Sequence, residues 1–296
     1  MPIPFTTVID LQTALKKDRL DGKKIGFVPT MGALHAGHLS LITRAAAEND
    51  IVVCSIFVNP TQFNNATDLE KYPRMPDADI HLLKQAGCDY AFLPSVDEIY
   101  PNGKQLLDIH FGPLEKVMEG EFRPGHFKGM ATVVNRLFEI VNPRAGYFGK
   151  KDFQQLAIVK NMVKQLRLPV NVIGCDTLRE EDGLAMSSRN LLLTPPQRKA
   201  APLIFKSMMT AQEFIPFHTV EAVKELVIRY IQQSPLLKVE YFEIVNPDTL
   251  QAIHDWNECN QVQACIAVLT EGPRLIDNVT YFILFLVQKS LIFSVK

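Results

Sequence analysis

The stretch Pro29-Thr-Met-Gly-Ala-Leu-His35-Ala-Gly-His38 decides the fold prediction. It follows the short apolar run at residues 25–29, which has the length of a strand. It leads into residues 38–49, where apolar side chains recur at helical spacing. A strand that turns directly into a helix is the first unit of a parallel α/β sheet.

The rest of the first 175 residues repeats this alternation. Residues 51–58 are almost wholly apolar, which is typical of a central parallel strand covered on both faces. The further strands expected are residues 89–93, 146–148 and 170–174, and the expected helices are residues 7–20, 77–86, 128–141 and 153–166. Strands joined through helices predict a Rossmann-like, doubly wound parallel sheet that binds ligands beyond the carboxyl ends of its strands.

The pattern changes after about residue 190. Two helical segments, at 196–214 and 220–233, precede strand-like residues 239–245 and 265–269. This predicts a smaller C-terminal α+β domain, so we expect a binding domain over residues 1–185 and a lid domain over 186–296. The end of the lid domain, residues 279–296, is an apolar tail that could add a strand, cover an interface or stay poorly ordered.

Composition excludes several classes of protein. The 296 residues are 47% hydrophobic and carry a net charge of -1, so bulk positive charge does not drive binding to nucleic acid. The apolar run at 281–287 is too short to span a membrane. Five scattered cysteines and an N-terminus without a signal-peptide pattern indicate reduced thiols and a cytoplasmic location. The chain contains no GxGxxG, GxxxxGK[ST] or GxSxG motif, which argues against dinucleotide enzymes, P-loop NTPases and α/β-hydrolases.

The turn at residues 29–38 has the features of a phosphate site. A strand-to-helix turn is expected to aim free backbone N–H groups and a positive helix end at one point. Gly32 and Gly37 let a ligand approach the backbone, while His35 and His38 can donate to phosphate oxygens. The alternatives are histidines that only cap and pack, or a metal pair, although no acidic or thiol partner stands at zincin spacing.

A second loop, Met186-Ser187-Ser188-Arg189, carries hydroxyls and a guanidinium suited to a triphosphate. Alone it would be a common solvated turn. Together, the HxGH and MSSR segments resemble the two signatures of the nucleotidyltransferase superfamily, which includes class I aminoacyl-tRNA synthetases.

Four more stretches narrow the resemblance. They are Phe57-Val-Asn-Pro-Thr-Gln-Phe63, Tyr72-Pro-Arg74, Arg123-Pro-Gly-His-Phe127 and Phe148-Gly-Lys-Lys-Asp-Phe-Gln-Gln155. With PTMGALHAGH and DGLAMSSRN, they run in order through most of residues 25–190. In this order they resemble the pantothenate synthetase (pantoate–β-alanine ligase) family.

The resemblance implies an ATP-dependent ligase that joins pantoate to β-alanine through a pantoyl adenylate, releasing pyrophosphate and AMP. It also implies Mg²⁺ with the ATP and a homodimer. Because an adenylate must be shielded from water, we expect the lid domain to close. Charge and hydropathy predict no nucleic-acid or membrane partner. Two rivals are a nucleotidyltransferase that stops after adenylyl transfer to a phosphorylated acceptor, and a non-catalytic ATP-binding or assembly protein. The neutral amides Gln62 and Gln155 argue against the first, because a phosphate acceptor would favour positive charge.

Residue roles carried over from the family fall into four sets. The catalytic set is His38, His35, Lys151, Ser187, Ser188 and Arg189. The ATP-binding set is Met31, Gly32, Ala33, Leu34, His35, Ala36, Gly37, His38, Gly149, Lys150, Lys151, Asp152, Leu178, Met186, Ser187, Ser188 and Arg189. The substrate set is Gln62, Gln155, Asn59, Arg123 and His126, with Arg123, His126 and Lys128 expected to form a mobile basic flap. The metal candidates are Asp79 and Asp77.

Each set has a plainer interpretation. Loop amides such as Asn59 can satisfy local backbone, residues 150–152 can be a capped helix start with solvated lysines, and the flap can be a solvated charge run. Two residues depart from the family pattern: Ala78 stands where an acidic residue is frequent, and Lys150 replaces an acidic residue.

Overall fold

The computed structural model describes residues 1–63 and 66–283. The chain divides into two compact units. The first unit comprises residues 1–115, 119–150 and 155–178, and the second comprises residues 116–118, 151–154 and the chain from Arg179 onward. The boundary expected after residue 185 stays a prediction.

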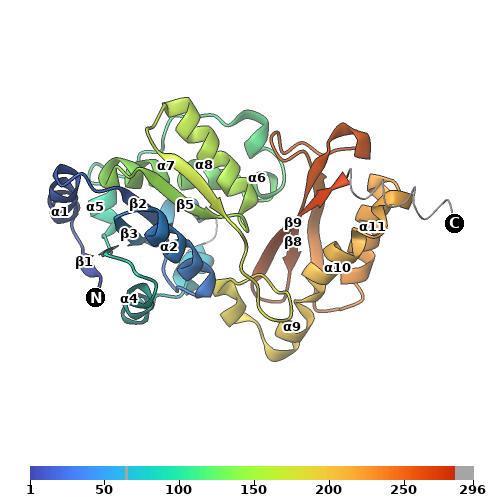
Figure 1. Ribbon diagram of the computed structural model, residues 1–296. Helices are drawn as coiled ribbons and strands as arrows, with labels where there is room; N and C mark the ends of the chain where they lie inside the picture. The colour runs from blue at the N-terminus through green and yellow to red at the C-terminus, as the bar shows by residue number, and fades with distance from the viewer. Residues whose placement is uncertain (64–65, 284–296) are drawn as a thin grey trace. The chain divides into compact units, whose positions relative to one another are not determined.

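In the described residues, the first unit contains a parallel sheet of six strands in the order β1-β4-β3-β2-β5-β6 (Figure 1). Its strands are β1 (Ile3–Phe5), β2 (Ile25–Thr30), β3 (Ile51–Ile56), β4 (Tyr90–Phe92), β5 (Ala145–Gly149) and β6 (Asn171–Cys175). From β2 the chain builds outward through β3 and β4, and then returns to the other side of β2 with β5 and β6. This confirms the doubly wound prediction and places the switch point at the carboxyl ends of β2 and β5.

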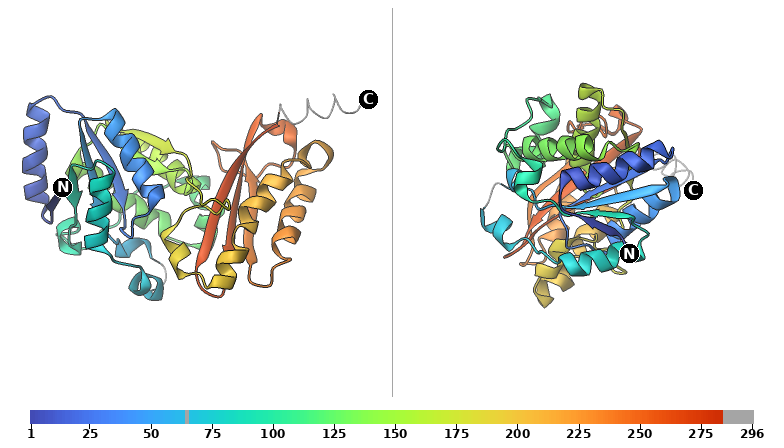
Figure 2. Two further views of the ribbon diagram at one scale, coloured as in Figure 1. Left: turned by 60° about the horizontal axis from the view of Figure 1, so that its bottom comes forward. Right: turned by 90° about the vertical axis from the view of Figure 1, so that its left-hand side faces the viewer.

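Helices cover both faces of this sheet (Figure 2). On one face, α1 (Val8–Leu20), α7 (His126–Val141) and α8 (Phe153–Leu166) share a core cluster with Phe27 and Val53. On the other, α2 (Ala36–Glu48) and α4 (Pro76–Gln85) pack with Val28 and Cys54. Burial on both faces is the reason that β2 and β3 are continuous apolar runs. The shorter helical segments are α3 (Ala66–Lys71), α5 (Val96–Ile99), α6 (Glu119–Phe122), η1 (Pro60–Gln62) and η2 (Gly112–Glu115).

The second unit is α+β, as predicted. Strands β7 (Lys238–Val245), β8 (Gln261–Leu269) and β9 (Arg274–Phe282) form an antiparallel sheet in that order. The helices α10 (Leu203–Ala211) and α11 (Val220–Ile231) pack on it around a separate apolar core (Figure 1). The remaining helical segments are α9 (Pro195–Ala200), η3 (Ser188–Leu192), η4 (Ile215–Phe217) and η5 (Trp256–Glu258).

Three elements differ from the prediction. The single helix expected at 196–214 is wrong: the chain forms α9 and then α10, with Pro202 as the N-cap of α10, because proline cannot donate to a continuing helix. Strand β1 was not predicted, being only three residues long. Strand β9 includes residues 279–282 of the expected tail, while residues 284–296 lie outside the described part of the chain.

Candidate functional site

The turn from β2 to α2 has a strained backbone. Gly32 has a φ of +80° and Ala33 a φ of +49°. A non-glycine residue in the left-handed region needs support from its surroundings. Asp79 supplies it, because its carboxylate oxygens accept from the N–H groups of Ala33, at 3.0 Å, and Leu34, at 2.7 Å. The shape of the turn therefore depends on a side chain from α4.

Asp79 and Asp77 do not form a shared metal site. Asp79 is 2% exposed, and burial raises the pKa of its carboxyl against the opposing effect of the two backbone hydrogen bonds. Asp77 is exposed, and residues two apart on a helix do not face each other. Among residues 1–63 and 66–283, no group of three or more His, Cys, Asp or Glu side chains could hold a metal ion. Magnesium bound together with substrate phosphates needs only one or two protein carboxylates, so Asp79 and Asp77 stay candidate ligands.

The two histidines of the turn cap α2 together. His35 is the N-cap, and its Nδ1 accepts from the Gly37 N–H at 3.1 Å. The His35 N–H in turn donates to His38 Nδ1 at 3.4 Å, and the ring centroids are 4.1 Å apart. A backbone N–H donates only to a ring nitrogen without a hydrogen, so each neutral ring carries its hydrogen on Nε2. The histidines thus cap the helix, as one alternative held, and the hydrogen of each neutral ring is on Nε2.

The free backbone N–H groups predicted for this turn are largely absent. The Gly32 N–H donates to Thr30 Oγ1 at 3.2 Å, and the His38 N–H donates to the His35 carbonyl at 2.8 Å. With the four N–H groups already described, most of the turn is satisfied internally. The prediction of a backbone phosphate cradle is wrong for these residues. The imidazole rings are therefore the better candidates for donors to a phosphate.

Buried amide side chains in the segment that follows β3, at η1, form a hydrogen-bonded network. Asn59 is 1% exposed and Gln62 is 8% exposed. Asn59 Nδ2 donates to Gln62 Oε1 at 3.2 Å, and Gln62 Nε2 donates to Met31 Sδ at 3.1 Å. Gln62 therefore contacts Met31 of the histidine turn, and two of the predicted sites, the ATP turn and the acid-binding amides, are adjacent in the first unit.

His126 is buried and forms a hydrogen bond to this network. It is 6% exposed in the first turn of α7, and its Nδ1 donates to the Gln62 carbonyl at 2.8 Å. Burial and a backbone hydrogen bond hold the ring here, and the mobility expected of the flap stays a prediction. Arg123 lies 3.5 Å from Glu119 as an ion pair, and Lys128 lies in α7.

The loop after β5 contributes lysines to both units. Lys150, in the first unit, donates to Asp176 Oδ1 at 2.6 Å. Lys151, in the second unit, has its Nζ 3.9 Å from Asp152 Oδ2 and a side chain 18% exposed. Asn278 Nδ2 of β9 donates to the Lys151 carbonyl at 2.7 Å. The backbone of Lys151 is therefore positioned by a strand that the sequence did not predict.

Further contacts in the second unit support Asn278. Asn278 Oδ1 accepts from Gln263 Nε2 at 2.7 Å. The neighbouring Asp277 receives both guanidinium nitrogens of Arg179, at 2.6 and 2.9 Å. Arg179 also lies over the Phe205 ring, 3.7 Å from its centroid. Paired hydrogen bonds of this kind fix orientation as well as distance.

The Met186–Arg189 segment starts a short helix. Ser187 is the N-cap of η3, and its Oγ accepts from the Arg189 N–H at 3.3 Å, while Ser188 is buried. The two other predicted contacts lie in the first unit: Gln155 is partly buried on α8, and Leu178 is 41% exposed. The structure thus brings His35, His38, Met31, Gln62 and Asn59 together in one unit, and holds Lys151 and residues 186–189 in the other.

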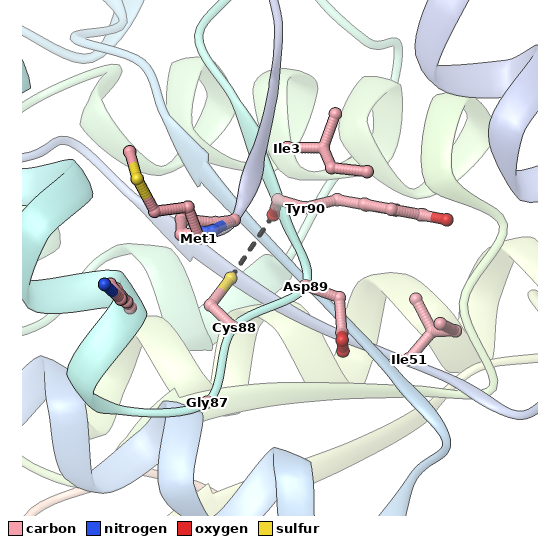
Figure 3. A pocket seen from close by; sticks show the side chains of 9 residues that line it. Met1, Ile3, Ile51, Gly87, Cys88, Asp89 and Tyr90 are labelled. Carbon is pink, nitrogen blue, oxygen red and sulfur yellow. Dashed lines mark hydrogen bonds between the residues drawn. The ribbon is translucent and has the colours of Figure 1, made fainter.

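A cavity of about 400 Å³ lies elsewhere on the first unit (Figure 3). Its lining includes Ile3, Ile51 and Tyr90, the residues that begin β1, β3 and β4. It is therefore at the amino-terminal edge of the sheet, opposite the edge at which the histidine turn follows β2. The cavity is separate from the candidate site.

Comparison with known proteins agrees with this arrangement. The family model described as pantoate-beta-alanine ligase matches residues 4–280. Pantothenate synthetase from Bacteroides fragilis is 49% identical over 275 residues, covering 93% of this chain and 97% of the relative. The crystal structure of pantothenate synthetase from Thermus thermophilus matches with a TM-score of 0.88 at 43% identity, covering 94% of this chain and 98% of that one.

The pantoate-beta-alanine ligase from Francisella tularensis, solved in complex with Beta-gamma ATP and β-alanine, matches with a TM-score of 0.79 at 35% identity, covering 94% of this chain and 97% of that one. With the family model spanning nearly the whole chain, the protein belongs to the pantoate–β-alanine ligase family.

Proposed function

We propose that the protein condenses pantoate with β-alanine in an ATP-dependent reaction through a pantoyl adenylate. Family membership supports this reaction, and the Francisella tularensis relative was solved with Beta-gamma ATP and β-alanine. Among the contacts in the structure, the mutual cap of His35 and His38 carries the proposal. It places both imidazole rings at the N-terminus of α2, where the positive end of the helix dipole favours an anion.

In the first step, a pantoate carboxylate oxygen attacks the α-phosphorus of ATP. The new O–P bond forms as the bond from the α-phosphorus to the bridging oxygen breaks, and pyrophosphate leaves with the electron pair. The developing charge is stabilised by His35, His38, Lys151, Ser187, Ser188 and Arg189. Catalysis of this kind is mainly positioning and electrostatic stabilisation, without a covalent enzyme intermediate.

The acid is bound by neutral amides. Gln62 and Gln155 hold pantoate, and Gln62 also borders the β-alanine position, while Arg123 contributes positive charge. His126 acts on this subsite through the Gln62 carbonyl to which it donates. Neutral groups suit this role because they bind the acid without competing for the phosphates.

In the second step, the β-alanine amine attacks the adenylate carbonyl. A C–N bond forms, the C–O bond to AMP breaks with its electron pair leaving on AMP, and the proton lost from the nitrogen passes to solvent. His38 is the group we assign to the phosphate of the departing AMP. Magnesium would be held by the ATP phosphates together with one or two protein carboxylates, for which Asp77 and Asp79 are the candidates, and would neutralise part of the phosphate charge.

The oligomeric state and the cellular location stay predictions. A homodimer is implied by resemblance and would appear in light scattering at twice the 33.4 kDa chain mass. A cytoplasmic location is also expected. Within the described residues, no helix has both the length and the apolar character needed to cross a bilayer.

The direct test adds substrates in order. The purified protein is incubated with ATP and magnesium, then pantoate, then β-alanine, while pyrophosphate, AMP and product mass are followed. We expect pyrophosphate only after pantoate, and AMP with pantothenate only after both. Release of pyrophosphate without pantoate, or ATP binding with no pantoate-dependent turnover, would contradict the proposal. Transfer that stops at an adenylylated product would favour the nucleotidyltransferase alternative.

A further inference from the structure

The orientation of the Gln62 amide is set by a chain of hydrogen bonds that begins at Tyr100. Tyr100 follows α5, and its hydroxyl donates to Asn59 Oδ1 at 2.8 Å. Burial raises the pKa of Tyr100, partly opposed by Thr61, so the hydroxyl keeps its hydrogen at neutral pH. Asn59 Nδ2 then donates to Gln62 Oε1 at 3.2 Å. The two amides and the phenol therefore point in one donor-to-acceptor direction.

Asn59 cannot turn over within this network. Its Oδ1 also accepts from the Thr61 N–H at 3.3 Å and from Thr61 Oγ1 at 3.0 Å. Its Nδ2 also donates to the Gly129 carbonyl at 3.3 Å. A flipped amide would set N–H₂ against these donors and an oxygen against a carbonyl. Because both ends of the amide are used inside the protein, Asn59 positions its neighbour and is not placed to contact substrate itself.

The hydrogen bonds that hold the Asn59 amide, called the amide lock below, decide which end of the Gln62 amide can face a ligand. Its Oε1 is occupied by Asn59, and within the described residues its Nε2 donates to the thioether of Met31. A thioether sulfur is a weak acceptor. A buried N–H₂ with such a partner gains when an oxygen replaces the sulfur. Gln62 is thus prepared to donate, and its ligand atom must be an acceptor.

We propose that Tyr100 is a positioning residue for the acid-binding subsite, acting through Asn59 to keep the Gln62 amide in its donor orientation. The inference rests on the proposed function in one respect, that Gln62 contacts the hydroxy acid. It adds that this subsite selects an oxygen acceptor, either a carboxylate or a hydroxyl. An analogue with an ammonium group in place of that oxygen would be rejected, because its N–H groups would face the N–H₂ group of Gln62.

Tyr100→Phe removes the phenolic hydrogen bond and little else. We expect KM for pantoate to rise about 3- to 10-fold, with KM for ATP unchanged, because Thr61 still holds part of the lock. Asn59→Asp, which has no N–H to donate, should give a larger rise. The matched control is Tyr147→Phe, since Tyr147 is also buried and donates through its hydroxyl, to Glu48 at 2.8 Å. The control should leave KM for pantoate unchanged.

A Gln62→Ala background separates positioning from general disturbance. If Tyr100 acts through Gln62, then adding Tyr100→Phe to Gln62→Ala should change KM for pantoate less than about 2-fold. An equal effect in both backgrounds would overturn the inference. So would a Tyr100→Phe variant whose KM for pantoate matches that of the wild type.

A spectroscopic measurement needs no turnover. In the free protein, the Gln62 side-chain N–H₂ should show a nuclear Overhauser effect to the Met31 methyl group, and the effect should weaken in Asn59→Asp. An unchanged effect would overturn the lock. If the wild type shows the effect but no pantoate-dependent pyrophosphate, then the proposed substrate fails while the amide orientation stands.

Discussion

At the residue scale, the buried carboxylate of Asp79 holds the backbone of the turn from β2 to α2. Without it, the N–H groups of Ala33 and Leu34 would lose their partners, and Ala33 would lose the support for its left-handed backbone. A buried donor without a partner costs about 1–3 kcal/mol. Asp79 therefore acts on the turn from β2 to α2 through the backbone, and its role as a metal ligand stays a prediction.

The raised pKa of Asp79 gives a pH dependence with a definite sign. Burial makes the native state hold the proton to a higher pH than the unfolded chain does. The stability that Asp79 contributes is therefore full below its ordinary pKa, roughly 4, and is lost as the pH rises through the raised native value. We expect the difference in unfolding free energy between wild type and Asp79→Asn to fall across that window. Urea titrations at several pH values measure it, and a difference that grew with pH would contradict the assignment.

The two roles of His38, capping and donation, can be separated. His38→Gln keeps a side-chain acceptor at the third helical position, which is the usual partner in a capping box. We expect His38→Gln to keep the thermal stability of the wild type but to lose about 10²-fold in pantoate-dependent pyrophosphate release, because an amide that caps through its oxygen no longer places an N–H at the position of the imidazole Nε2–H. His38→Ala should lose the same activity and also about 1 kcal/mol of stability. If His38→Gln retained full activity, the imidazole ring would not be required for pyrophosphate release, which would contradict the role assigned to it.

At the element scale, the contact between η1 and α7 sets the position of Gln62. A Cβ on Gly129 would lie 2.1 Å from the Thr61 carbonyl oxygen, so only glycine lets the two segments approach this closely. The Gly129 carbonyl also accepts from Asn59. The backbone of α7 therefore supplies one of the acceptors that hold the Asn59 amide in place.

Gly129→Ala should push η1 away from α7. We expect a loss of about 1–3 kcal/mol in the free energy of unfolding, as for other overpacked contacts, and a higher KM for pantoate. Gly272→Ala is the control, because its nearest neighbour to a new Cβ is a side-chain oxygen at 3.9 Å. Denaturation curves and initial rates for both variants provide the test. A Gly129→Ala variant indistinguishable from Gly272→Ala would show that η1 can shift freely.

At the scale of the whole molecule, the candidate groups belong to both units. The histidines and the amide network are in the first, while Lys151 and residues 186–189 are in the second. Each unit has its own apolar core, so each set is held by separate packing.

If both units serve the first chemical step, their residues should behave as one set. His38→Gln and Lys151→Ala should each lower pyrophosphate release by about 10²-fold, and the double variant should lose less than the product of the two. Lys164→Ala, an exposed lysine on α8, is the control. Unfolding transitions that match the wild type would confirm that the losses are chemical. A strictly multiplicative double variant would indicate that the two groups act on different steps.

The sequence by itself determined the alternation of strands and helices, the doubly wound class and the position of the histidine turn. These features depend on hydrophobic periodicity and on caps, which are written in residues a few places apart. Thr7 as the cap of α1 and the start of α8 at Phe153 were predictable for the same reason. The family motifs added a prediction of the reaction.

Only the tertiary structure decided which side chains hold the reacting ones. Asp79 is 46 residues from Ala33, Tyr100 is 41 from Asn59, and Asn278 is 127 from Lys151. No local pattern marks such partners, because each hydrogen bond exists only after helices and strands have packed. The same cause explains why the backbone N–H groups predicted to be free are bonded. Their acceptors are largely side-chain atoms, and the spacing of residues in the sequence does not show where those side chains point.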